Sequence, residues 1–214
     1  MQLTEAWREY MPETLQLRYR MRETRNASAI LRSSNAELYG DVIHVLSEFT
    51  LEARDLLLPG GSEGSVAKKL NGAFRELGWR EARVDTVTQT TLVVFPYAPH
   101  NESEKRLVSS DPVSFEGYKA DWVKGRVAGD CEWNAKDGNL DRDLASYRSL
   151  YETGYIDAAV LVTRTQADLR ELEAELTSVL MATPDDEAAE ALRTTDAVIT
   201  ATKQRIATGT AKGM

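Results

Sequence analysis

The stretch Asp121-Trp-Val-Lys-Gly-Arg-Val-Ala-Gly-Asp130-Cys131-Glu132 decides how this chain is expected to fold. Residues 119–123 and 126–133 have the composition of two short strands, joined by a tight turn at Lys124-Gly125. Side chains two apart on a strand point to the same face, so Asp130 and Glu132 are expected to project together. The turn can bring Asp121 beside them. The hairpin therefore predicts three carboxylates at one end of a sheet.

Strands and helices alternate in the rest of the sequence. Residues 156–162 (IDAAVLV) form an apolar run that is typical of a strand buried on both faces. Residues 84–95 also predict a strand, and residues 100–115 a polar loop. This pattern indicates a single domain over residues 1–214, of the α/β (α+β) class, with a mixed sheet flanked by helices. Helices are expected at residues 36–58, 65–77, 166–181 and 185–206, and after Asp143 as far as Gly154.

Composition excludes several classes of protein. One cysteine, Cys131, among 214 residues excludes an internal disulfide and a multi-cysteine zinc site. His44 and His100 are the only histidines and leave little for a histidine-based site. The sequence has no apolar run long enough to span a bilayer and no signal pattern at its start, so we expect a cytoplasmic protein without a membrane partner. The net charge of −8 argues against indiscriminate coating of nucleic acid.

The three acidic residues are candidates for a metal site. Oxygen ligands without thiolate or imidazole suit a hard divalent ion, Mg²⁺ by default. Acidic residues on a hairpin are more often solvated, or paired with a neighbouring base such as Lys124 or Arg126. The second strand is mostly apolar, however, and burying a carboxylate without a partner on a half-buried strand costs free energy. Both interpretations remain open on spacing alone.

The motifs around this hairpin resemble the BglII-like type II restriction endonucleases of the PD-(D/E)XK superfamily. The resemblance runs in order from about Arg20 to Arg164 and is carried by several separate segments. These are Arg25-Asn26-Ala27, Val45-Leu46-Ser47-Glu48-Phe49, Gly78-Trp79-Arg80-Glu81, Val123-Lys124-Gly125-Arg126-Val127-Ala128, Glu132-Trp133-Asn134, Asp141-Arg142-Asp143-Leu144 and Ile156-Asp157.

The resemblance implies a restriction-endonuclease-like core that works as a homodimer on double-stranded DNA. It implies Mg²⁺-dependent hydrolysis of one phosphodiester per strand within a palindrome, in this family often one centred on GATC, leaving 5′-phosphate ends. Asp121 matches the first metal-binding aspartate and Asp130 the second acidic position, and the main-chain carbonyl of Cys131 would be a further metal ligand. Glu132, where the superfamily commonly has lysine, would orient or deprotonate the attacking water. A cognate DNA methyltransferase would complete the restriction-modification system.

Two features leave the assignment incomplete. Asp130 is one methylene shorter than the glutamate expected there, and Gly129 precedes it where a β-branched residue would be usual. The alternative is therefore a catalytically weak or inactive site-specific DNA-binding protein of the same fold. Weaker candidates for DNA contact are Lys119, Lys124, Asn134 and Lys136.

Overall fold

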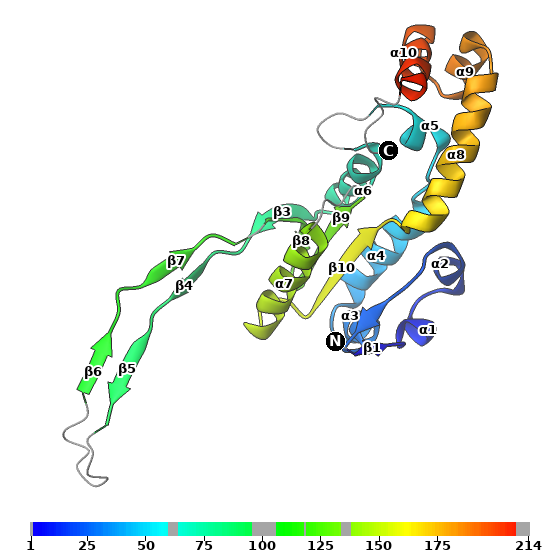
Figure 1. Ribbon diagram of the computed structural model, residues 1–214. Helices are drawn as coiled ribbons and strands as arrows, with labels where there is room; N and C mark the ends of the chain where they lie inside the picture. The colour runs from blue at the N-terminus through cyan, green and yellow to red at the C-terminus, as the bar shows by residue number, and fades with distance from the viewer. Residues whose placement is uncertain (1, 60–63, 96–105, 118, 134–137, 209–214) are drawn as a thin grey trace.

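The computed structural model describes residues 2–59, 64–95, 106–117, 119–133 and 138–208. The described part is a mixed α/β fold in which helices flank a four-stranded sheet of order β10-β9-β8-β3 (Figure 1). β9 pairs parallel to β10 and antiparallel to β8, and β8 pairs antiparallel to β3. The sheet strands are β3 (Arg80–Arg83), β8 (Lys119–Lys124), β9 (Val127–Glu132) and β10 (Ala158–Thr163).

The predicted hairpin is present as β8 and β9. Gly125 and Arg126 form the turn between them, and Gly125 has φ +56°, the left-handed region that favours glycine. β9 lies between β8 and β10 and is almost wholly buried. The apolar run at residues 156–162 supplies β10, so the predicted strand is present. β10 lies at the edge of the described sheet and most of its residues are half-buried, so the expected burial on both faces is wrong.

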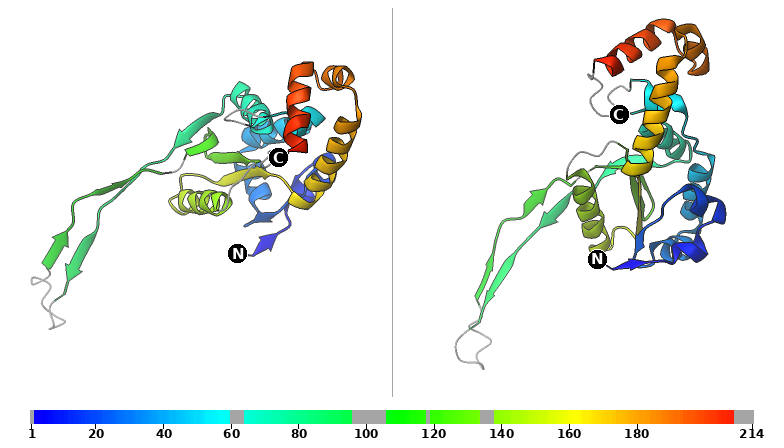
Figure 2. Two further views of the ribbon diagram at one scale, coloured as in Figure 1. Left: turned by 45° about the horizontal axis from the view of Figure 1, so that its top comes forward. Right: turned by 45° about the vertical axis from the view of Figure 1, so that its right-hand side comes forward.

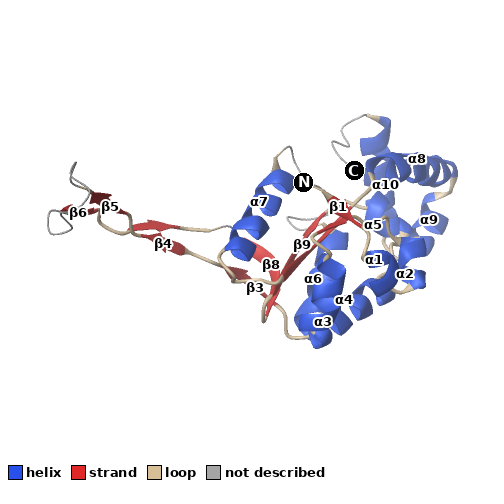
Figure 3. Cartoon of the chain, turned by 90° about the horizontal axis from the view of Figure 1, so that it is seen from below, coloured by secondary structure: helices blue, strands red, loops and turns tan. Residues whose placement is uncertain are grey.

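Helices cover both faces of the sheet (Figure 3). On one face, α3 (Ala27–Ser34), α4 (Ala36–Glu48) and α6 (Ser65–Glu76) form the main core with Trp79, Trp122 and Val127. On the other face, α7 (Asn139–Glu152) packs through Tyr147 against Ala120 and Ala128. The central sheet is therefore enclosed between an apolar layer of three helices and a single covering helix.

The remaining helices lie at the two ends of the chain. α8 (Gln166–Ala182), α9 (Asp185–Ala191) and α10 (Asp196–Ala207) share a separate apolar cluster with α5 (Ala53–Leu57). The N-terminal segment holds α1 (Trp7–Tyr10), α2 (Glu13–Arg18) and a two-stranded pair, β1 (Leu3–Thr4) with β2 (Glu23–Thr24). In the described residues, we find no helix of the length and apolar character that crossing a bilayer requires.

A long two-stranded arm extends from β3 and β8 (Figures 1 and 2). β4 (Thr86–Thr88) pairs with β7 (Val113–Phe115), and β5 (Thr91–Val94) pairs with β6 (Arg106–Ser109). The prediction of a loop over residues 100–115 is therefore wrong for 106–109 and 113–115, which form the returning strands. These strands are short and fully exposed, and Arg106-Leu107-Val108-Ser109 does not alternate between polar and apolar residues, so the sequence carries little strand signal.

The predicted helix at residues 36–58 is interrupted. α4 ends at Glu48 and α5 begins at Ala53. Arg18 donates to the backbone carbonyls of Ser47, at 2.6 Å, and Phe49, and the Tyr19 hydroxyl donates to the Leu46 carbonyl at 2.9 Å. These bonds satisfy carbonyl groups that a helix end leaves without partners. The interruption depends on side chains about thirty residues away in sequence, so local periodicity could not show it.

Gly129 is required by close packing in the middle of the sheet. A Cβ atom there would lie 2.6 Å from the Val160 carbonyl oxygen and 2.8 Å from the Trp122 ring. Trp122 in turn stacks on Phe74, with ring centroids 4.2 Å apart. The glycine therefore admits the large Trp122 side chain to the core.

Gly129→Ala is expected to lower the free energy of unfolding by roughly 1–3 kcal/mol, because the added methyl group overpacks the sheet. The matched control is Gly40→Ala, at an exposed position in α4 with nothing within 4 Å of the added Cβ. That change should stabilise the protein by up to about 1 kcal/mol. Urea unfolding measures both variants; equal stabilities would contradict this account of Gly129.

Candidate active site

A β-bulge places Asp121. From Ala120 to Val123 the chain advances three residues along β8, while the paired β3 advances two, from Ala82 to Arg80. The extra residue in β8 lies at Asp121 or Trp122. Bulges re-aim side chains and disturb the local ladder. Here Trp122 is buried in the main core, while Asp121 Oδ2 accepts a hydrogen bond from the Cys131 backbone N–H at 3.3 Å.

β8 and β9 separate at the aspartates. The paired residues end at Trp122 and Gly129, one position before Asp121 and Asp130 would meet. The Asp121 N–H donates instead to the Asp130 carboxylate, at 2.8 Å from Oδ1. A side chain has thus replaced a backbone acceptor at this point, and both carboxylates lie where the strands part.

Asp130 is buried, with 6% of its surface exposed. The hydroxyl of Tyr147, on α7, donates to Asp130 Oδ2. Burial is the largest influence on this carboxyl and raises its pKa to about 7, opposed by the hydrogen bonds from Tyr147 and the Asp121 N–H. The negative charges of Asp121 and Asp143 act in the same direction as burial. Without a neighbouring cation, burial therefore favours the protonated form of Asp130.

Glu132 lies at the end of β9, beside the start of α7. Burial, followed by the charge of Asp143, raises its pKa. Arg142 Nη2 lies 3.8 Å from Glu132 Oε1 and 2.9 Å from Asp143 Oδ1. Because Asp130 and Glu132 both contact α7, they lie on the same side of the sheet.

Asp143 and Tyr147 lie beside Asp130 and Glu132, although sequence reasoning did not assign them to the site. We call Asp121, Asp130, Glu132 and Asp143, with the Tyr147 hydroxyl, the acidic cluster. Asp143 is 4% exposed, and its Oδ2 is the buried side-chain oxygen or nitrogen without a hydrogen-bond partner among the described residues. The two residues are four apart on α7, one helical turn, and so face the sheet together. That spacing, with an acid among the apolar positions of the helix, was the available signal.

The donor chemistry of this cluster fits a hard divalent cation. Carboxylate oxygens dominate, the carboxyls of Asp130 and Glu132 have raised pKa values, and one buried oxygen lacks a partner among the described residues. As the side chains stand, no three His, Cys, Asp or Glu residues of the described segments converge closely enough to hold one ion. Both Asp130 oxygens accept hydrogen bonds from the protein itself. Metal binding would therefore require the Asp130 carboxylate to exchange a protein donor for the cation.

The residues predicted to contact DNA differ in what their side chains contact. The Lys124 ammonium contacts Asp41 at 2.9 Å, Glu37 at 3.3 Å and the Leu77 carbonyl at 3.0 Å, which gives it a structural role between β8, α4 and α6. Lys119 pairs with Glu81 at 2.7 Å, and its side chain is 65% exposed. Asn134 and Lys136 lie outside the described residues.

Cys131 is buried, and its thiol has a pKa raised to about 12 by burial and then by the charge of Asp121. A thiol with so high a pKa is inert as a nucleophile.

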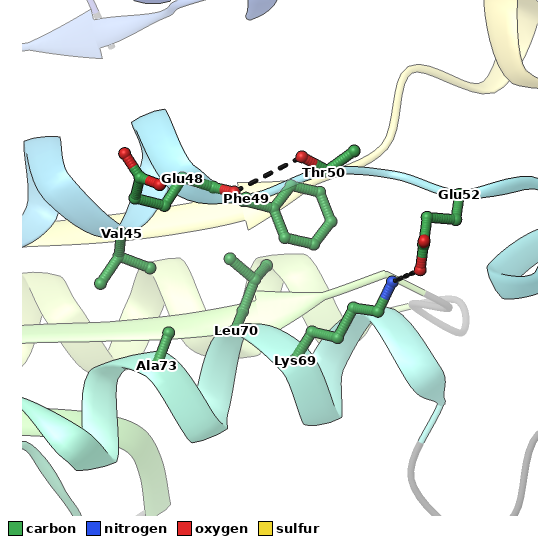
Figure 4. A pocket seen from close by; sticks show the side chains of 8 residues that line it. All are labelled: Val45, Glu48, Phe49, Thr50, Glu52, Lys69, Leu70 and Ala73. Carbon is green, nitrogen blue, oxygen red and sulfur yellow. Dashed lines mark hydrogen bonds and ion pairs between the residues drawn. The ribbon is translucent and has the colours of Figure 1, made fainter.

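A cavity of about 340 Å³ lies between α4 and α6 (Figure 4). It is lined by Leu70 and Phe49, among others, with Lys69 at one end. The Lys69 ammonium is 2.8 Å from Glu52 and 2.5 Å from Asp55, so it is paired with carboxylates of the protein itself. None of the predicted acids lines it.

Comparison with models of known protein families gives the family of the chain. The sequence matches the family model described as Restriction endonuclease BglII/BglIII over residues 19–212. The chain belongs to this family of restriction endonucleases. The match includes β8, β9 and α7, and with them every residue of the acidic cluster. A comparison with curated protein sequences gave no match.

Membership of the BglII/BglIII family makes the chain a nuclease, a hydrolase that acts on DNA. Hydrolysis of a phosphodiester needs groups that bind the phosphate and activate water. In the described part of this BglII/BglIII-family chain, the Asp121 N–H donates to the Asp130 carboxylate, and Glu132 lies two residues beyond Asp130 on β9. This is the arrangement that we take forward as the candidate active site.

The raised pKa of Asp130 predicts a specific pH dependence of stability in metal-free buffer. Because the folded pKa of about 7 lies above the ordinary value of 3.8, the native state binds this proton more tightly than the unfolded state. The stabilisation is complete below about pH 4 and is lost as the pH rises through 7, with a slope of at most about 1.4 kcal/mol per pH unit.

Asp130→Asn should remove this slope, and urea unfolding in EDTA at pH 4 to 8 measures it. Asp157→Asn is the matched control: the hydrogen bond from Arg126 lowers the pKa of Asp157, so its replacement leaves the Asp130 slope in place. Parallel curves for wild type and Asp130→Asn would show that Asp130 titrates normally.

Proposed function

We propose that this protein is a type II restriction endonuclease that cuts both strands of double-stranded DNA at a specific palindrome. The observation that carries the proposal is the acidic cluster at the parting of β8 and β9, in a chain of the BglII/BglIII family. The products would carry 5′-phosphate and 3′-hydroxyl ends. The proposed recognition sequence, centred on GATC, follows from family resemblance alone.

The proposed cofactor is Mg²⁺, held by Asp121, Asp130 and the main-chain carbonyl of Cys131. When bound, it would neutralise charge on the scissile phosphate and lower the pKa of water. Asp121 is already directed toward Cys131 by the bulge in β8. Asp130 would lose its proton in favour of the cation, because opposite charge nearby favours the ionised carboxylate.

Glu132 is proposed to orient or deprotonate the attacking water. Its raised pKa suits a general base, because a base with a pKa nearer the working pH accepts a proton more effectively. Arg142 lies beside it and beside Asp143, and its positive charge limits the rise in the pKa of Glu132. Lys119 remains the proposed phosphate contact on β8, together with Asn134 and Lys136 beyond β9. Lys124 has less support, because its ammonium already contacts two carboxylates.

Family resemblance also supports a homodimer and a cognate methyltransferase, in a cytoplasmic restriction-modification system. The alternative is a DNA-binding protein that recognises its site without efficient cutting. It is favoured by one observation, namely that protein donors occupy both oxygens of Asp130.

Cleavage assays separate the two functions. Wild-type protein with Mg²⁺ should convert plasmid DNA to discrete fragments, and EDTA should stop the reaction. Asp121→Asn should abolish cutting but retain a gel shift, and Glu132→Gln should slow cutting roughly 10²–10⁴-fold. Asp186→Asn, at an exposed position on α9, is the matched control and should cut normally. A gel shift without cutting by wild type would support the alternative, and unchanged cutting by Asp121→Asn would refute the metal assignment.

Mg²⁺ should also stabilise the protein in the absence of DNA. A cation that binds only the native state adds about 1.4 kcal/mol for each tenfold excess over its dissociation constant. Thermal unfolding should therefore shift upward with Mg²⁺ concentration in wild type and in Asp186→Asn. No shift is expected in Asp121→Asn. An equal shift in all three proteins would place the cation elsewhere.

A further inference from the structure

Tyr147 lies buried between α7 and the sheet, where its ring and its hydroxyl make different contacts. The ring belongs to one apolar cluster with Ala120, Ala128 and Ile156. The hydroxyl donates a hydrogen bond to Asp130 Oδ2. The apolar contacts do not involve the hydroxyl, so the ring can keep its place whether or not the hydroxyl bonds to Asp130.

The two donors that Asp130 accepts in the described structure are both neutral. The Asp121 N–H donates to Oδ1 at 2.8 Å, and the Tyr147 hydroxyl donates to Oδ2. Neither donor offsets the negative charge of the carboxylate, on which the charges of Asp121 and Asp143 also act. A divalent cation does offset it, because opposite charge nearby favours the ionised carboxylate. The cation is therefore the stronger partner for Asp130.

The two donors differ in how freely they can leave Asp130. The Asp121 N–H is part of the backbone of β8, and its neighbours Ala120 and Trp122 are paired with β3 and β9. Because the peptide group is planar, this N–H cannot turn away unless the strand moves. The Tyr147 O–H turns about its own C–O bond while the ring stays in place. Of the two donors, the hydroxyl is the one that can exchange with a cation.

Asp143 offers the hydroxyl an acceptor on the same helix. It precedes Tyr147 by one helical turn and faces the sheet with it. Its Oδ2 is buried and has no hydrogen-bond partner among the described residues. Burial, and then the charges of Asp130 and Asp143, raises the pKa of Tyr147, so the charge of Asp143 acts on this hydroxyl. A buried donor that loses its acceptor costs free energy, and Asp143 limits that cost.

We propose that the Tyr147 hydroxyl holds Asp130 Oδ2 in the metal-free protein and releases it when a divalent cation binds. Tyr147 is then a positioning residue that acts through Asp130. The inference rests on the proposed function in taking Asp130 as a metal ligand. Because the hydrogen bond is made in the metal-free state alone, it stabilises that state and weakens metal binding by the same free energy. The hydroxyl thus sets the Mg²⁺ concentration that the site needs.

Tyr147→Phe tests the proposal, because it removes the hydroxyl and keeps the ring. Thermal unfolding of the full chain is followed without DNA at about pH 8.5, where a proton competes little with the cation, in EDTA and across a Mg²⁺ titration. The variant should be less stable than wild type in EDTA, and saturating Mg²⁺ should restore most of the difference. Its half-saturating Mg²⁺ concentration should be about tenfold lower, the low end of what a hydrogen bond to a charged group contributes.

Tyr19→Phe is the matched control. The Tyr19 hydroxyl donates to the Leu46 carbonyl at 2.9 Å, beside the main core on the other face of the sheet. This variant should lose the same stability in EDTA and in Mg²⁺, and it should keep the wild-type half-saturating concentration. The proposal would be overturned if Tyr147→Phe behaved in the same way, or if it required more Mg²⁺ than wild type. Absence of any Mg²⁺ shift in both wild type and Tyr147→Phe would also overturn it.

Carbon-13 NMR of the tyrosine Cζ atoms in wild type supplies a measurement that does not depend on the stability of a variant. The Tyr147 signal should move as Mg²⁺ is added, because its hydroxyl changes acceptor, and the Tyr19 signal should not. A Tyr147 signal that Mg²⁺ leaves in place would overturn the proposal. Failure of the proposed function is distinguishable, because a protein that shows these Mg²⁺ effects without cutting DNA leaves the role of Tyr147 intact.

Discussion

The buried carboxylate of Asp130 is the constraint on which the site depends. It accepts a hydrogen bond from the Asp121 N–H, which in a regular ladder would donate to a backbone carbonyl. The described pairing of β8 with β9 ends at that point. The Asp130 carboxylate also accepts a hydrogen bond from the Tyr147 hydroxyl, which connects α7 to the sheet. Burial makes its ionised form costly, as the raised pKa of about 7 shows. A divalent cation would remove that cost, so the same group links the local fold to the proposed chemistry.

The opposite face of the hairpin provides the rigidity that such a site requires. Trp122 fills the main core against Phe74, and Gly129 leaves the space that its ring occupies. One residue away along β8, Asp121 faces the parting of the strands. Consecutive residues of a strand point to opposite faces, so Trp122 serves the core and Asp121 the acidic cluster. Gly129 is therefore part of the packing of Trp122 in the core.

Sequence patterns predicted the elements whose signals are local. The turn at Gly125, the apolar run of β10 and the helix that carries Tyr147 were all evident, and with them the positions of Asp121, Asp130 and Glu132 on two strands. Features that depend on partners far away in the sequence could not be predicted. Arg18 ends α4 through bonds to Ser47 and Phe49, and the arm has no buried face to produce a periodic pattern. Asp143 was missed as a site residue because only the packing of α7 on β9 shows that its Oδ2 is buried and unpartnered.

The central claim is that a divalent cation completes the acidic cluster at Asp130. A carbon-13 NMR titration of the Asp130 carboxyl, first in EDTA and then with saturating Mg²⁺, tests this claim most directly. We expect an apparent pKa of about 7 without metal and a fall toward or below the ordinary aspartate value with Mg²⁺. A titration curve that Mg²⁺ leaves unchanged would contradict the account, because the cation would then have no contact with the group assigned to hold it.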